Sequence, residues 1–322
     1  MSNDMSASAT TKIPVSEMTT FAPGDGRAAE PVLASAAEHG FTHELIIQPS
    51  RGWMGVNWSE LWRYRELLGF LVWRDVKVRY KQAVLGIAWA VLEPVMTMIL
   101  FTAIFGVAAG LRKNLPDTIP YAVFIFAGLI PWKLFQTALT QGGMSLVNSQ
   151  NLLTKIYFPR LFVPTSTIGS ALVDMCLQLG VFAVILLWYQ YVPSWQIIWL
   201  PPLILLTSML AAGMAYLLSA LTITYRDFRF LIPVISQMWM YLSLIHMPAP
   251  QSIRESVKWQ VVLGANPMYG IVSAFRACVT GDPNAVGFKP VYLVSSVVTS
   301  LLILALGVFY FRKTERRFAD IA

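Results

Sequence analysis

The chain alternates between long apolar runs and short polar connections over most of its length. Six runs hold 24, 20, 29, 27, 18 and 21 residues, and the fifth, which contains Pro233, is the shortest. A bilayer core of about 30 Å is crossed by about 20 apolar residues in a helix that rises about 1.5 Å per residue. The pattern predicts an all-α protein with six membrane-spanning helices, at residues 84–107, 121–140, 161–189, 197–223, 230–247 and 291–311.

Two segments precede the first run. Residues 1–52 are rich in Ser, Ala, Thr, Gly and Pro and have no apolar periodicity, which is typical of a disordered tail; they hold no apolar stretch of signal-peptide length, so we expect no cleavage. Residues 53–83 are too short of apolar residues to cross a bilayer. The predicted domains are therefore a tail at 1–52, a helical region at 53–83, and a membrane domain at 84–322.

The region at 53–83 predicts an amphipathic helix that lies in the inner membrane interface. At 100° per residue, Arg63, Arg74, Lys77 and Lys81 fall within about 60° of one another, and Trp and Leu residues occupy most other directions. Such a helix directs its cations to phosphate and its apolar residues to acyl chains. Two interpretations stay open here: an anchor for anionic lipid, or a site for the phosphate of a substrate.

Composition agrees with the apolar runs and excludes a soluble protein. Apolar residues make up 56% of the chain and charged residues 13%, against about 25% charged residues in soluble domains. The net charge is +7. With the six predicted spans, fourteen Lys and Arg residues fall on one side of the membrane and six on the other. Because basic loops stay in the cytoplasm, we expect both termini to be cytoplasmic.

Three charged residues lie inside the predicted spans, where each needs a partner or a function. Glu93 lies roughly 13 Å and Lys133 roughly 12 Å from the cytoplasmic ends of the first two spans, at 1.5 Å per residue. Consecutive spans are usually neighbours, so we predict that Glu93 and Lys133 form an ion pair. Asp174, in the third span, is the competing partner for Lys133.

The sequence holds no motif for catalysis or metal binding. It has no Walker loop for nucleotide phosphates, no H-E-x-x-H and no G-x-S-x-G, and His39, His43 and His246 are not spaced as a zinc site. In contrast, the predicted cytoplasmic loop at 142–160 carries Leu, Ile, Tyr and Phe residues. Apolar residues on a solvated loop indicate a protein partner, although the segment alternatively folds back onto the membrane surface.

Seven short stretches resemble a known family, the type-2 ABC-transporter permeases that export polysaccharides and lipid-linked glycans. They occur in the family's order and extend from about residue 61 to the C-terminus. The stretches are 74–82 (RDVKVRYKQ), 85–89 (LGIAW), 93–94 (EP), 127–132 (AGLIPW), 151–160 (NLLTKIYFPR), 225–227 (YRD) and 266–268 (NPM).

The resemblance implies a homodimer of six-helix permeases, each docked on a separate ATP-binding subunit. ATP and Mg would lie on that subunit, so no cofactor is expected on this chain and the chain itself is not an enzyme. The resemblance also implies a role in coupling to the ATPase for Asn151, Leu152, Leu153, Thr154, Lys155, Ile156, Tyr157, Phe158, Pro159, Arg160, Arg226 and Asp227.

Two further sites follow from the same resemblance. A polyprenyl-diphosphate or lipid headgroup is expected to enter beside Arg63, Arg74, Lys77, Arg79 and Lys81. Short re-entrant helices are expected in the last outer loop, with Asn266 and Pro267 at the outer gate. The chain departs from the family pattern at the end of the fifth span, where the usual Ser-Pro stretch is missing, and at Lys133, which is unusual in that position.

The predicted function is export of a polysaccharide, linked to polyprenyl diphosphate, across the bacterial inner membrane. The alternatives are an exporter of the same fold for a smaller lipid or drug, a secondary transporter that runs on an ion gradient, and a membrane-embedded transferase. The sequence leaves open which glycan is moved and whether the ATPase carries a domain that binds the end of the glycan.

Overall fold

The computed structural model describes residues 62, 64–81, 86, 88–153, 158–250 and 256–315. Every regular element in these ranges is a helix, which confirms the predicted all-α class. The tail predicted at 1–52 lies outside the described residues, as do Arg63 and residues 154–157.

Five helical segments are long and apolar enough to cross a membrane. The first joins α4 (Ala88–Phe101) to the π-helix η3 (Thr102–Ala108). The second joins α5 (Tyr121–Thr137), the π-helix η5 (Ala138–Gly142) and α6 (Gly143–Asn148). The others are α8 (Phe162–Trp188), the 3₁₀ helix η6 (Trp195–Trp199) with α9 (Leu200–Thr224), and α15 (Pro290–Glu315). They correspond to five of the six predicted spans.

The remaining predicted span corresponds to α10 (Phe228–Leu242), which has 15 residues and is therefore shorter than a bilayer requires. A turn at 243–247 follows it. Ile232 lies against Gly143 at one end of the α5–η5–α6 segment. At the other end, the Tyr121 hydroxyl donates to the His246 carbonyl at 2.9 Å. The helix and its turn thus extend along the length of the second segment, but six crossings stay a prediction.

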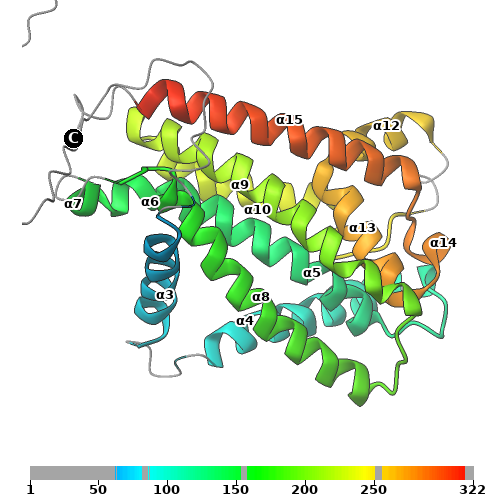
Figure 1. Ribbon diagram of the computed structural model, residues 1–322. Coiled ribbons are helices and arrows are strands. Elements are labelled where there is room, and N and C mark those ends of the chain that lie inside the picture. The colour runs from blue at the N-terminus through cyan, green and yellow to red at the C-terminus, as the bar shows by residue number, and fades with distance from the viewer. Residues whose placement is uncertain are drawn as a thin grey trace, which may run out of the picture. The chain divides into compact units, whose positions relative to one another are not determined.

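The main core is built around α5, whose side chains are buried along almost the whole helix. α8, α9 and α13 (Pro267–Thr280) pack around it, and α4 contacts it from a further side (Figure 1). α9 and α15 pack closely along each other, and Gly213 and Gly307 face each other at this contact. Small residues at such a crossing let two backbones approach closely.

Further helices lie at the two ends of this bundle (Figure 1). One end holds α6, α7 (Gln150–Leu153) and α3 (Arg65–Lys81). The other holds α12 (Val257–Ala265), α13 and α14 (Pro283–Val286), which lie between α10 and α15 in the chain, in the loop for which re-entrant helices are predicted. The 3₁₀ helix η4 (Leu111–Asn114) connects the first two long segments.

A second, smaller core joins the elements at the α3 end. Its buried members come from five parts of the chain, and Tyr64, Leu67, Leu68 and Leu152 pack against it. The members are Leu71, Leu146, Phe158, Leu161, Phe162, Val163, Ala220, Ile223 and Phe311. This core fixes α3 to the ends of α6, α8, α9 and α15.

Candidate functional site

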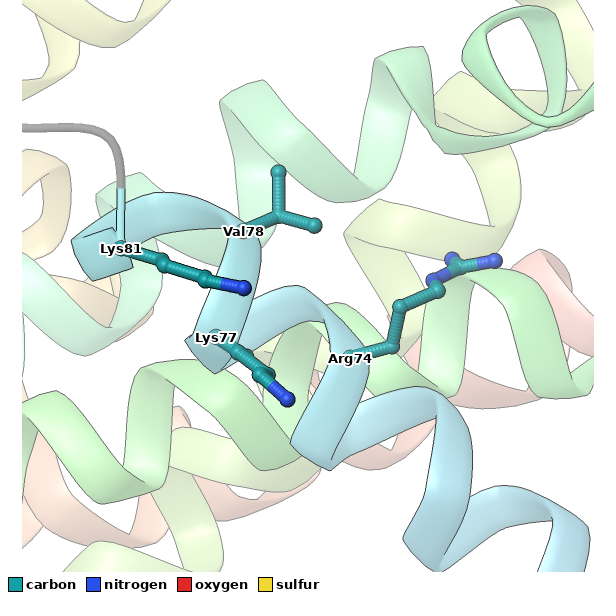
Figure 2. Close-up of a pocket in the computed structure, with 4 residues that line it drawn as sticks. All are labelled: Arg74, Lys77, Val78 and Lys81. Carbon is teal, nitrogen blue, oxygen red and sulfur yellow. The ribbon is translucent and has the colours of Figure 1, made fainter.

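The basic face of α3 forms a shallow hollow of about 240 Å³, lined by Arg74, Lys77, Val78 and Lys81 (Figure 2). These positions recur every three or four residues, so they lie on one side of the helix. Among the described residues, neither Lys77 nor Lys81 makes an ion pair, and both are exposed. The hollow therefore presents two free ammonium groups to an anion.

Arg74 differs from the two lysines because its guanidinium is already engaged. It donates to Asp75 Oδ1 at 2.8 and 3.1 Å, and its side chain is 35% exposed. The other Asp75 oxygen accepts from Ser166 Oγ of α8 at 2.7 Å. Asp75 thus fastens α3 to α8 while it holds Arg74 at the edge of the hollow.

Arg79 and Tyr80, at the end of α3, are directed into the bundle. Arg79 forms an ion pair with Asp174 of α8, and it also donates to Gln141 and, at 3.3 Å, to Ser170 Oγ. The Tyr80 hydroxyl donates to the second Asp174 oxygen. Burial, together with the neighbouring Asp174 carboxylate, raises the pKa of Tyr80, so the phenol stays protonated and remains a donor. Arg79 therefore does not line the hollow, although the sequence predicts it beside the other basic residues.

The ion pair predicted from matching depths in consecutive spans is present. Lys133 of α5 forms an ion pair with Glu93 of α4; the lysine side chain is 13% exposed and that of the carboxylate 64%. Asp174, the competing partner, is instead bonded to Arg79 and Tyr80.

A larger cavity of about 600 Å³ lies between α3, α4, the α5–η5 segment and α8. Both ion pairs contribute to its wall. The residues that line it are Arg79, Tyr80, Gly86, Trp89, Ala90, Glu93, Pro94, Lys133, Gln136, Thr137, Thr140, Gln141, Asp174 and Gln178. This set is unusually polar for a space between apolar helices.

The segment predicted to couple to the ATPase is described at its two ends. Leu152 packs against the smaller core and Phe158 belongs to it, with 6% of Phe158 exposed. Arg160 donates to the Glu315 carbonyl at 3.2 Å, at the C-terminal end of α15 where cations are favourable. Thr154, Lys155, Ile156 and Tyr157 lie outside the described residues. Arg226 and Asp227 are exposed in the turn between α9 and α10.

The residues predicted at the outer gate connect α10 to α13. Asn266 caps α13 by accepting from the Met268 amide at 3.1 Å, and it also accepts from Trp239 Nε1 at 2.9 Å. Its amide nitrogen donates to Ser243 Oγ at 3.0 Å. Pro267 is buried at the first turn of α13, where its missing N–H is not needed.

The family model described as "ABC-2 type transporter" matches residues 66–279, which is more than half of the 322-residue chain. The chain belongs to the ABC-2 type transporter family. The match begins in α3 and ends in α13, so it includes both ion pairs, the cavity and the predicted coupling segment.

Curated relatives extend this similarity over most of the chain. The "O-antigen export system permease protein RfbA" of Myxococcus xanthus is 28% identical over 80% of this chain and 96% of its own length. A protein of the same name from Klebsiella pneumoniae is 26% identical over 80% of this chain and 95% of its own length. The "Polysialic acid transport protein KpsM" of Escherichia coli is 24% identical over 75% and 91%.

Sequence reasoning about this ABC-2 chain missed one buried cation. Arg276 of α13 is 3% exposed, and its guanidinium donates to the carbonyls of Phe124 at 3.1 Å, Leu244 at 3.3 Å, and Ile245. It also lies over the Phe124 ring, 3.7 Å from the centroid. A lone Arg between apolar residues in a loop is the only sequence signal, and it does not reveal these partners.

The polar cavity has a clearer signal in the sequence. Positions 133, 136, 137, 140 and 141 follow the i, i+3, i+4, i+7, i+8 pattern, so one face of an apolar run is polar. No group of three or more His, Cys, Asp or Glu side chains with metal-binding geometry occurs in the part of the chain that the structure describes.

Proposed function

We propose that this chain is the permease subunit of an ATP-driven exporter that moves a polysaccharide, linked to polyprenyl diphosphate, across the bacterial inner membrane. The observation that carries the proposal is the collinear similarity to export permeases, which covers 80% of this chain and 96% of the Myxococcus xanthus relative. The relatives' names include both O-antigen and polysialic acid. They favour a sugar polymer over a small lipid or drug, but they leave the charge of the polymer open.

In this proposal the permease is a homodimer with six crossings per copy and both termini in the cytoplasm. α10 and its turn provide the fifth crossing, supported by their contacts with both ends of the second long segment. α3 lies in the inner interface, supported by its exposed Trp73 and Phe70 beside the cations. α12, α13 and α14 form the re-entrant region at the outer side.

The diphosphate of the lipid carrier enters at the α3 hollow. Lys77 and Lys81 supply the free positive charge, and Arg74 supplies guanidinium donors that Asp75 holds in place. Arg63 precedes them on the same face of the predicted helix. Arg79 acts differently from the proposal made on sequence alone, because its ion pair with Asp174 leaves it little capacity for a phosphate.

Two ATP-binding subunits, which carry ATP and Mg, dock on the segment from Asn151 to Arg160 and on the turn at Arg226 and Asp227. The smaller core supports a mechanical link, since Phe158 of this segment, Leu71 of α3 and Phe311 of α15 belong to one buried cluster. Closure of the ATPase would thus move the coupling segment and α3 together. Such a rigid-body transition is transmitted by packed side chains without any flexible connector.

The outer gate opens where α10 meets α13. Asn266 bonds to Trp239 and Ser243 across this contact, and Pro267 is buried at the first turn of α13. Because Asn266 makes both of these bonds, a shift of α10 relative to α13 would affect them together. The gate is therefore proposed to respond to the same motion that begins at the coupling segment.

Deletion of the gene from its host tests this proposal. The deletion strain is expected to lose surface polysaccharide and to accumulate the polymer in the cytoplasm, and a plasmid copy is expected to restore export. Restoration should fail when the catalytic glutamate of the co-purifying ATP-binding subunit is replaced. Undiminished surface polysaccharide in the deletion strain would contradict the proposed function, and export that survives loss of the ATPase would favour a secondary transporter.

A further inference from the structure

The cavity between α3, α4, α5–η5 and α8 is distinct from the α3 hollow and has a different chemistry. Lys133, Gln136, Thr137, Thr140 and Gln141 form one polar face of a segment that is otherwise buried and apolar. Polar groups inside a membrane domain are costly unless they face partners or a hydrated space. The cavity wall is therefore built to contact something polar.

The charges in this wall cancel in pairs. Lys133 is paired with Glu93, and Arg79 is paired with Asp174. Each cation already has a carboxylate partner, so the cavity offers no free positive charge to a carboxylate or a phosphate. An anionic ligand would have to displace one of these partners, which would leave a carboxylate without its cation.

One acceptor in the wall has no partner. Gln178 of α8 is 5% exposed, and its Oε1 has no hydrogen-bond partner among the described residues. A buried acceptor left unpaired is unfavourable, so we expect it to accept from a bound donor. The neighbouring Gln136 and Thr137 both donate and accept, as a ligand that carries hydroxyl groups requires.

An aromatic wall completes the cavity. Trp89 of α4 lines it and is 51% exposed, so its ring is free to stack on a flat apolar surface. A sugar ring has such a surface on its C–H face and hydroxyl groups along its edge. The volume of about 600 Å³ lies within the range of about 300–1,000 Å³ that is typical of small-molecule sites.

We propose that this cavity is a binding subsite for an uncharged sugar residue, with Trp89 stacked on the ring and Gln178 accepting one of its hydroxyl groups. The inference rests on the proposed function, because the sugar belongs to the exported polymer. It adds a substrate class to that function: a neutral chain fits the paired charges, whereas a uronate or sialate carboxylate does not. A lipid headgroup is disfavoured because its phosphate would need a free cation.

Saturation-transfer NMR on the purified permease–ATPase complex in nanodiscs tests the subsite, with maltotriose as the neutral probe and trigalacturonate as the acidic probe. The wild type is expected to transfer saturation to maltotriose and much less to trigalacturonate. Gln178→Leu removes one hydrogen bond and should weaken maltotriose binding about 2- to 10-fold. Trp89→Ala should weaken it at least as much. The matched control, Gln237→Leu, changes an exposed residue of α10 outside the cavity and should bind as the wild type does.

A charge variant gives the sharpest contrast. Glu93→Gln leaves Lys133 without its carboxylate, so this variant should gain binding of trigalacturonate that the wild type lacks. Each variant is first checked for thermal stability and for co-purification with the ATPase. Thr137→Val, on the same polar face, replaces Gln178→Leu if that variant does not fold.

The proposal is overturned if the wild-type complex does not bind maltotriose, if it binds both probes equally, or if the cavity variants bind maltotriose as the wild type does. Competition by glycerol phosphate would instead identify a headgroup site and would also overturn it. The polysaccharide-export assay distinguishes failure of the proposed subsite from failure of the proposed function. Lost or unselective binding with intact export contradicts only the subsite, whereas export that persists in the deletion strain contradicts the proposed function.

Discussion

At the scale of single residues, the charged groups that line the cavity are arranged as ion pairs. Asp174 accepts from Arg79 and Tyr80, and Glu93 accepts from Lys133. The Asp174 side chain is 13% exposed and that of Arg79 is 25% exposed, so water screens the pair only partly. Removal of one partner leaves a charge without compensation, which is more costly than removal of both.

A double-mutant cycle tests the Arg79–Asp174 pair. Arg79→Gln and Asp174→Asn should each lower the free energy of unfolding by about 1–3 kcal/mol, because each leaves a partly buried charge unpaired. The double variant should lose less than the sum, with a coupling energy of about 0.5–3 kcal/mol. Equilibrium unfolding by SDS in mixed micelles measures these values. Strict additivity would mean that the pair makes no contribution.

Arg276 fixes the turn after α10 to α5, because it donates to the Leu244 and Ile245 carbonyls of the turn and to the Phe124 carbonyl of α5, and Gly128 of α5 leaves room for its guanidinium. A Cβ atom at Gly128 would lie 2.5 Å from Arg276 Nη2 and 2.9 Å from Cζ. Gly128→Ala should therefore destabilise the protein by about 1–3 kcal/mol through overpacking. The drop in melting temperature in detergent measures this effect. Gly180→Ala is the control, because nothing lies within 4 Å of a Cβ atom there; equal melting temperatures for the two variants would contradict the prediction.

At the scale of elements, the contact between α9 and α15 is a backbone contact. A Cβ atom at Gly307 would lie 2.2 Å from the Gly213 carbonyl oxygen, and one at Gly213 would lie 2.6 Å from the Leu304 nitrogen. Backbone atoms cannot rotate away as the end of a side chain can. A larger residue at either position requires the two helices to separate.

Gly307→Ala should therefore lower the melting temperature more than Gly128→Ala does. The reason is that overpacking, at about 1–3 kcal/mol in a core with movable side chains, here acts on two rigid helices. Thermal unfolding followed by tryptophan fluorescence gives the comparison. Gly264→Ala is the matched control, since its Cβ atom would be in ordinary contact with Tyr292 at 3.5 Å. A Gly307→Ala variant as stable as this control would show that α9 and α15 are less closely packed than described.

The α3 helix combines a buried attachment with an exposed basic face. Leu71 is 1% exposed in the smaller core, whereas Lys77 and Lys81 are exposed. Cations near an anionic membrane surface contribute about 1 kcal/mol each. The exposed lysines of α3 can therefore be substituted while Leu71 still holds the helix to the smaller core.

The variant Lys77→Gln/Lys81→Gln should reduce polysaccharide export while it leaves ATPase association unchanged. The two lost charges weaken phosphate binding by about 2 kcal/mol, and the packing of Leu71 is not altered. Surface polysaccharide and co-purified ATPase are measured on the same cells. Lys113→Gln, on η4, should leave both unchanged. Loss of the ATPase from the double variant would assign α3 to docking instead of to the substrate.

At the scale of the whole molecule, α10 decides the topology. Five helical segments are long and apolar enough to cross a membrane, and a sixth crossing by α10 and its turn would return the C-terminus to the cytoplasm. Without that crossing, α15 would run through the membrane in the opposite direction, and its C-terminal end would lie outside the cytoplasm. The fifteen-residue helix is thus the element on which the orientation of the last third of the chain depends.

Cysteine labelling tests this topology in a Cys176→Ala/Cys278→Ala background. Asn284 lies in α14, just before α15 begins, and Lys313 lies in the last turn of α15. Both residues are exposed. With six crossings, Asn284→Cys should react with a membrane-impermeant maleimide on intact spheroplasts, and Lys313→Cys should react only after the membrane is permeabilised. The reverse pattern would show that α10 does not cross.

The sequence is sufficient to predict the features that depend on the length of an apolar run or on the depth of a residue within it. The five long apolar helices follow from run length, and the Glu93–Lys133 pair follows from two depths and the proximity of consecutive helices. The α10 span was predicted with 18 residues but forms a helix of 15, because the chain turns after Leu242. That turn is held by Arg276 and Tyr121, neither of which is near it in the sequence.

The sequence by itself thus determined the all-helical membrane class, the long helices and the family, because a bilayer imposes a length and an apolar composition that can be read along the chain. Only the tertiary structure decided which faces meet. It directed Arg79 to Asp174 instead of to the α3 hollow, placed Gly213 against Gly307, and gathered Trp89, Gln178 and two ion pairs around one cavity. These contacts join residues far apart in the chain, and helix rotation and tilt, which residue spacing does not encode, select among them.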